Sequence, residues 1–246
     1  MTLPFRIPWH HAAEDRVGRL CRLLDRAHVP HSRKSPETAL ESLPVVDPPG
    51  RLARRQLQKF HFPLAMPARV ALFESGFCLD GAIRQFAARD IGQLKEYVPE
   101  ALVLSLPLAL AMADQKLRKL LDLPTLTRAI VVLTSIAEMP LLDHQRTLLW
   151  RAFGVPQFEQ FRGYDGAVLA RECEVHDGLH IDEAAAIFQK DGEELLVTQL
   201  TAESLVLRVR TGLTGSIVTE HCECGAETPR LRGLASLHSQ AHLAVA

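Results

Sequence analysis

The sequence lacks an apolar run long enough to cross a membrane. Its most apolar stretch, residues 102–113, contains Ser105 and Pro107 and is shorter than the roughly 20 residues that a membrane helix needs. It also lacks an excess of charge of either sign, because the formal net charge is -1. A near-neutral chain gives no electrostatic footprint for nucleic acid or an anionic membrane. No apolar segment follows a basic region near the N-terminus, so no signal peptide is expected. We therefore expect a cytoplasmic protein with neither nucleic acid nor membrane as a partner.

The chain also lacks an even set of cysteines from which a disulfide framework is built. Its 5 cysteines are an odd number and are widely spaced, which is not typical of a disulfide-bonded extracellular domain. A reducing cytoplasm leaves such thiols available for packing or for metal binding. The thiols to consider are Cys21, Cys78, Cys173, Cys222 and Cys224.

Helices joined by a proline-rich linker are predicted for residues 1–68. Apolar residues at helical spacing predict a helix over 14–28, which Pro30 ends. The prolines of residues 30–50 predict a loop with little regular structure. A second helix is predicted over 51–60.

Strands that alternate with helices are predicted for residues 69–166, the expected α/β core. The segment 129–134 is continuously apolar and β-branched, which is typical of a strand buried on both faces. Alternation of this kind predicts βαβ units and a largely parallel sheet with flanking helices. The expected strands are 69–73, 101–106, 129–134 and 156–161, and the expected helices are 80–88, 91–97, 108–121 and 141–153.

Strands without helices are predicted for residues 167–234, so the fold class is α/β with a smaller antiparallel β subregion after the parallel sheet. Residues 235–246 are expected to form a flexible tail. The expected strands are 168–175, 179–188, 194–200, 205–209 and 216–219, separated by turns at Asp177-Gly178, Asp191-Gly192 and Thr211-Gly212.

A metal site is the most specific chemical feature that the residues predict. Cys222 and Cys224 are two positions apart, and in an extended segment such residues point to the same side. Two thiolates make half of a tetrahedral zinc shell. If Asp177-Gly178 form a two-residue hairpin turn, Cys173 and His180 lie on one face as diagonal neighbours and supply the other half. A four-ligand site of this kind is closed and structural, so folding would be coupled to metal binding.

Two other histidines remain candidates for the fourth ligand. A three-residue turn would reverse the face of His180, so the choice between His180 and His176 depends on turn type, and His221 adjoins the cysteine pair. The competing interpretation is that the cysteines are small buried apolar residues and that His180 is a core histidine. Three of five cysteines gathered around one histidine favour zinc.

Several segments occur in a specific order: 172–181, 194–201, 207–212, 222–225 and 229–231. This order resembles that of the phenylacetate–CoA ligase-like, adenylate-forming enzyme family, and the similarity extends over about residues 95–234. Enzymes of that family bind ATP and a carboxylic acid, form an acyl-adenylate and transfer the acyl group to coenzyme A. The resemblance implies the adenylate-forming fold and, because family members often pair, a homodimer.

Groups that this chemistry requires have no counterpart in the sequence. The Ser/Thr/Gly-rich loop that cradles ATP phosphates is absent, and residues 74–76 are the nearest fragment. The family's Y-G-x-T-E motif falls on residues 164–168, so Val168 takes the place of the magnesium-binding carboxylate. Its R-T-G-D motif falls on residues 210–213, so Leu213 takes the place of the ribose-binding aspartate. The chain is expected to lack the family's mobile C-terminal domain. No lysine follows Lys190, so the catalytic lysine of that domain has no candidate.

These losses predict a truncated, degenerate member of the family: a non-catalytic or accessory homologue that keeps a structural zinc site and does not by itself use ATP or CoA. Tyr164, Asp165 and Arg210 are interpreted as a vestigial cleft for a nucleotide or another small molecule. The alternative is an acyl- or aryl-CoA ligase-type enzyme that activates a carboxylic acid together with a partner chain, which supplies the phosphate loop and the lysine.

Overall fold

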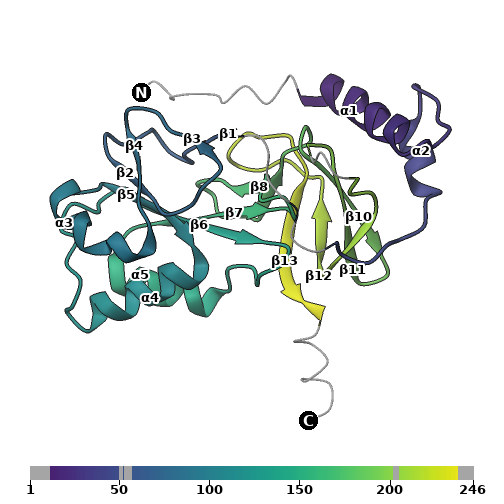
Figure 1. Cartoon of the computed structure of the whole chain (residues 1–246). Helices are drawn as coiled ribbons and strands as arrows, with labels where there is room; N and C mark the ends of the chain where they lie inside the picture. The colour runs from purple at the N-terminus through teal and green to yellow at the C-terminus, as the bar shows by residue number, and fades with distance from the viewer. Residues whose placement is uncertain (1–11, 50–51, 53–56, 202–204, 238–246) are drawn as a thin grey trace, which may run out of the picture. The chain divides into compact units, whose positions relative to one another are not determined.

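The chain forms two compact units, one made of residues 51–179 and the other of residues 1–50 together with 180–246. They are called here the α/β unit and the β unit. The computed structural model describes residues 12–49, 52, 57–201 and 205–237, which Figure 1 colours along the chain. Among these residues, no helix combines the length and the apolar character that crossing a membrane requires.

The sheet of the α/β unit is largely parallel, as predicted. Its strand order is β8-β7-β6-β5-β2-β4. All neighbouring pairs among β2, β4, β5, β6 and β7 are parallel, and β8 runs antiparallel to β7. The strands are β2 (Val70–Leu72), β4 (Ile83–Gln85), β5 (Ala101–Ser105), β6 (Ala129–Ser135), β7 (Gln157–Arg162) and β8 (Val168–Glu172), with a separate parallel pair of β1 (Gln58–Lys59) and β3 (Phe77–Cys78).

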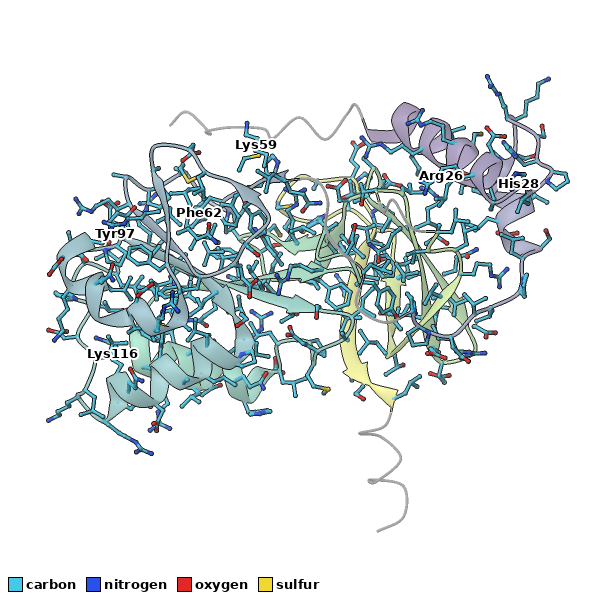
Figure 2. All side chains as sticks on the ribbon, viewed as in Figure 1. Arg26, His28, Lys59, Phe62, Tyr97 and Lys116 are labelled. Atoms are coloured by element: carbon cyan, nitrogen blue, oxygen red, sulfur yellow. The ribbon has the colours of Figure 1, made fainter. Side chains whose placement is uncertain are left out.

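Apolar side chains cover both faces of this sheet, which explains the continuous apolar character of β5 and β6. On one face lie the helices α4 (Leu106–Leu117) and α5 (Asp143–Phe153), as Figure 1 shows. Leu104 and Val132 belong to the core on this side. Alternate residues of the same strands pack on the other face against an aromatic cluster that contains Phe62, which is labelled in Figure 2.

Two of the helices predicted for this unit differ from the structure. The segment 80–88 is not a helix, because β4 pairs in parallel with β2 and the 3₁₀ helix η1 (Ala88–Gln93) begins only at its last residue. The helix predicted over 91–97 corresponds to the end of η1 and the short α3 (Leu94–Tyr97). Half of the helix predicted over 51–60 lies outside the described residues, and Gln58–Lys59 near its end form β1 instead.

The β unit is an antiparallel sheet, again as predicted. Its strand order is β10-β11-β12-β13-β9, and the pairs from β10 to β13 are antiparallel. The strands are β9 (Leu179–Ile181), β10 (Ala186–Asp191), β11 (Glu194–Gln199), β12 (Val209–Val218) and β13 (Arg230–Ser236).

Strand boundaries in the β unit differ from the prediction in three places. The strand expected over 179–188 is two strands, β9 and β10, because residues 182–185 form a turn closed by the amide of Ala185 and the carbonyl of Asp182. Thr211-Gly212 is not a turn between strands but lies within β12, where Gly212 has a φ of +68°. β13 was not predicted, and it extends into the segment expected to be a tail.

The N-terminal helices belong to the β unit rather than to a segment of their own. The helix predicted over 14–28 is α1 (Ala12–Arg26), whose Leu20 and Leu24 pack with Ile187 and Leu200 of the sheet side. α2 (Pro36–Glu41) forms within the stretch predicted to be irregular, because a proline at the first helical position is compatible with helix formation. The predicted boundaries at residues 68, 166 and 234 therefore do not coincide with the two compact units.

Candidate metal centre

Three cysteines and one histidine converge, and they are the four residues that the sequence singles out: Cys173, His180, Cys222 and Cys224. One ligand atom from each of them lies within 4.8 Å of every other. Bonds of about 2.3 Å to sulfur and about 2.0 Å to nitrogen at tetrahedral angles place a zinc-bound sulfur and nitrogen about 3.5 Å apart. Cys224 Sγ and His180 Nε2 are 3.4 Å apart. The cluster therefore has the donor set and the spacing of a tetrahedral metal site.

Both cysteine arms are tight turns, which corrects the two local geometries expected from the sequence. The segment 222–225 is not extended: the amide of Gly225 donates to the carbonyl of Cys222 at 2.9 Å, and Gly225 has a φ of +84° that favours glycine. The segment 173–176 turns in the same way, because the amide of His176 donates to the carbonyl of Cys173 at 3.1 Å. In each arm a metal-facing cysteine is the first residue of the turn.

The prediction of a two-residue hairpin turn at Asp177-Gly178 is also wrong. The proximity of Cys173 and His180 that it was meant to explain is nevertheless present. β8 ends at Glu172 and β9 begins at Leu179, so the connection spans residues 173–178. The longer connection moves Cys173 out of the strand and into the turn. It still brings the thiol to His180, which extends from β9 and is buried.

The three candidate histidines differ in their position relative to the thiols. Only His180 belongs to the cluster found among the described residues. His176 stacks on Phe158 with ring centroids 4.8 Å apart, and its Nδ1 lies 3.1 Å from a carboxylate oxygen of Glu172. His221 is exposed.

The residues interpreted as a vestigial cleft lie in local structures of their own. Asp165 closes the turn between β7 and β8, because its Oδ1 accepts from the amide of Ala167 at 2.9 Å. Tyr164 is buried beside it. Arg210 lies in the β unit, where it pairs with Glu194 at 2.6 Å and Asp191 at 3.4 Å. The hydrogen bond to Glu194 is the largest of the effects that raise the pKa of Arg210. A shared cleft formed by these residues stays a prediction.

The positions where the family resemblance places nucleotide-binding groups carry packing residues instead. Leu213 is buried in the β unit, and Val168 packs against the aromatic-covered core of the α/β unit. Glu74, in the fragment nearest to a phosphate loop, forms an ion pair of 3.3 Å with Arg162. The side chains of Leu213 and Val168 have no group that can form a hydrogen bond with a phosphate or a ribose.

A second buried polar cluster was missed by sequence reasoning. Glu159 on β7 accepts from the hydroxyl of Thr134 at 2.6 Å and from the amide of Leu141 at 3.1 Å. Burial raises the pKa of Glu159 to about 6 against the opposing effect of these donors. Glu172 accepts from the amide of Glu159 at 2.8 Å, and Arg146 reaches both carboxylates. The signal available in the sequence was the polar content of β7, QFEQFR, in a strand whose residues are all buried.

Solved structures of acyl-CoA ligases resemble the chain. Against 2-hydroxyisobutyryl-CoA ligase in the postadenylation state with 2-HIB-AMP, the TM-score is 0.65 at 13% identity, covering 96% of this chain and 72% of that chain. The same ligase with 2-HIB-AMP and CoA in the thioesterification state gives 0.64 at 13% identity, covering 94% and 69%. The chain has the fold of adenylate-forming acyl-CoA ligases.

The likeness has limits in extent and in sequence. In an open conformation of the ligase, the match has a TM-score of 0.56 at 15% identity and covers 69% of this chain, which spans only 45% of that one. Identities of this size show the fold and not the activity. No protein-family model and no curated protein sequence matches the chain.

Proposed function

We propose that this protein is a zinc-stabilised, non-catalytic or accessory homologue of acyl-CoA ligases, of the phenylacetate–CoA ligase type. The observation that carries the proposal is the convergence of three thiols and one imidazole within 4.8 Å. Its second part, the loss of catalysis, is supported by the residues that replace nucleotide-binding groups.

The donor set favours zinc over other metals. Thiolate and imidazole ligands in a tetrahedral arrangement are typical of Zn²⁺, whereas Ca²⁺ and Mg²⁺ take oxygen ligands. Four protein ligands leave no open position for water or substrate, so the ion has a structural role. Its effect is to join the turn at residues 173–176, the strand β9 and the turn at 222–225.

Loss of catalysis is supported by the side chains found at the positions of the family's nucleotide-binding motifs. Adenylation needs fixed charges around phosphate, magnesium and ribose, and preorganised electrostatics is usually the largest catalytic contribution. A valine in place of the magnesium carboxylate and a leucine in place of the ribose aspartate provide neither charge nor acceptor. Arg210 already pairs with two carboxylates of its own unit.

Metal content tests the zinc part of the proposal. We expect one zinc per purified chain, lost in Cys222→Ser and retained in Cys78→Ser. Cys78 is the matched control because it is an exposed cysteine outside the cluster. Zinc at the wild-type level in Cys222→Ser would remove the assignment.

Nucleotide binding and pyrophosphate release test the second part. Isothermal titration of the zinc-loaded chain with magnesium-ATP is expected to give no heat of binding. When the chain is incubated with magnesium-ATP and a library of carboxylic acids, no release of pyrophosphate is expected. Release that requires an added partner chain would establish the alternative, a ligase assembled from two chains. Tight magnesium-ATP binding by the chain alone would contradict loss of the nucleotide site.

A further inference from the structure

Three consecutive residues after the second cysteine turn contact His180, the residue that follows it, and the two residues that precede Cys222. Thr228 Oγ1 lies 3.0 Å from His180 Nδ1. The carbonyl of Pro229 accepts from the amide of Ile181, the residue after His180, at 2.8 Å. Arg230 donates from one guanidinium nitrogen to the carbonyls of Glu220 at 3.0 Å and His221 at 3.5 Å, directly before Cys222.

These contacts lie in the interior of the β unit, where they are costly to break. His180 and Arg230 are each 1% exposed, and Thr228 is 7% exposed. A buried polar atom that loses its partner destabilises the fold, so the hydroxyl of Thr228 and the imidazole of His180 hold each other in place. Arg230 and Pro229 fix the backbone on either side of this pair.

The contact with Thr228 orients the ring of His180 so that Nε2 faces the thiols. A neutral imidazole carries one N–H and one lone pair, and a metal takes the nitrogen with the lone pair. Nδ1 is directed to the Thr228 hydroxyl, whereas Nε2 is the atom 3.4 Å from Cys224 Sγ. When Nδ1–H donates to Thr228, the lone pair of Nε2 is directed to the thiols.

We propose that Thr228 is a positioning residue of the metal site and makes His180 bind through Nε2. The inference rests on the proposed zinc function of the cluster. Groups that hold the outer nitrogen of a metal-bound histidine typically change metal affinity by about 10- to 100-fold when they are removed.

Zinc affinity in matched variants of the full chain tests the proposal, with a chromogenic chelator competing for Zn²⁺. Thr228→Val keeps the side-chain shape and removes the acceptor, so we expect zinc to bind about 10- to 100-fold more weakly. Thr228→Ser restores the hydroxyl and is expected to bind zinc about as tightly as wild type.

Thr211→Val is the control for a general loss of packing. Thr211 is also buried in the β unit and donates to the carbonyl of Leu195 at 2.6 Å, but it is not part of the metal cluster. Its variant is expected to lose stability and to keep the zinc affinity of wild type. Equal zinc affinities of Thr228→Val and wild type would overturn the proposal while leaving zinc binding intact.

A measurement on the wild-type chain keeps the proposal testable if Thr228→Val does not fold. In protein loaded with cadmium-113 and labelled with nitrogen-15, coupling to the metal identifies the ligating nitrogen of His180. We expect coupling to Nε2 and a proton on Nδ1, and coupling to Nδ1 would overturn the proposal. A wild-type chain that holds no zinc and no cadmium would instead refute the proposed function, and this inference with it.

Discussion

Two polar clusters among the described residues, one buried and one partly buried, differ in the source of the cation that balances their charge. Glu159 and Glu172 of the α/β unit take their cation from the same chain, because Arg146 reaches a carboxylate oxygen of each at 3.5 and 3.0 Å. The three cysteines and His180 have the geometry of a site whose cation comes from solution. The first cluster is therefore complete whenever the chain is folded, whereas the proposed zinc site would make folding depend on metal supply.

The largest effect is expected from removing the metal. A structural zinc site in a small peptide contributes an apparent 10–16 kcal/mol or so, and part of that contribution is expected here because the ion joins three segments. A strong chelator is expected to lower the melting temperature of wild type markedly and to leave Cys222→Ser unchanged. Thermal unfolding by circular dichroism measures both. Equal shifts in the two proteins would mean that the chelator acts elsewhere.

The next largest effect is expected from Arg146→Met. Removing the guanidinium leaves the buried carboxylates of Glu159 and Glu172 without their arginine, which costs about 3–5 kcal/mol when a buried pair loses one partner. Urea unfolding is expected to show this loss of stability, while the zinc content stays at the wild-type level. A variant as stable as wild type would show that the backbone and hydroxyl donors alone hold the two carboxylates.

Glu159→Gln is expected to act in the opposite direction and to depend on pH. Burial raises the pKa of Glu159 from 4.5 to about 6, so the folded state binds its proton more tightly than the unfolded state does. Its contribution to stability is full below pH 4.5 and is lost as the pH rises through about 6. The glutamine variant, which cannot ionise, should therefore exceed wild type by about 2 kcal/mol at pH 7.5.

The difference between the two proteins should vanish well below pH 4.5, because wild-type Glu159 is then protonated in both states. Urea unfolding at a series of pH values measures it. A difference that stays constant over this range would mean that Glu159 binds its proton equally tightly in the folded and the unfolded state.

The smallest effect is expected from His176→Phe. This variant distinguishes the contribution of the Glu159–Glu172 cluster from that of the metal site. The phenylalanine keeps the stack on Phe158 and loses the contact with Glu172, so a stability change of up to about 1 kcal/mol is expected for this partly exposed pair. Zinc content is expected to be unchanged, because His176 is outside the cluster. Loss of zinc in this variant would favour His176 as a ligand.

The sequence predicted the α/β unit best where burial determines the pattern. β5 and β6 are apolar throughout because both faces of the sheet are covered, and α5 ends at Gly154, whose φ of +68° suits glycine. The short β4 was read as a helix because an edge strand of this length has no distinctive period. Its strand form comes from pairing with β2, which is a tertiary contact.

The candidate site was predicted in its residues and not in its local geometry. Cysteine spacing and one nearby histidine were enough to bring Cys173, His180, Cys222 and Cys224 together. The two turns that present the thiols are closed by backbone hydrogen bonds. The alternation of side chains in an extended strand, from which the site was predicted, does not describe such turns. Thr228 could not be found from sequence, because its importance comes only from the distance to His180.

The most direct test of the central claim is X-ray absorption at the zinc edge of the purified full-length chain. We expect one zinc per chain with three sulfur neighbours at about 2.3 Å and one nitrogen neighbour at about 2.0 Å. A chain without zinc, or a zinc shell of oxygen and nitrogen with fewer than three sulfurs, would contradict it.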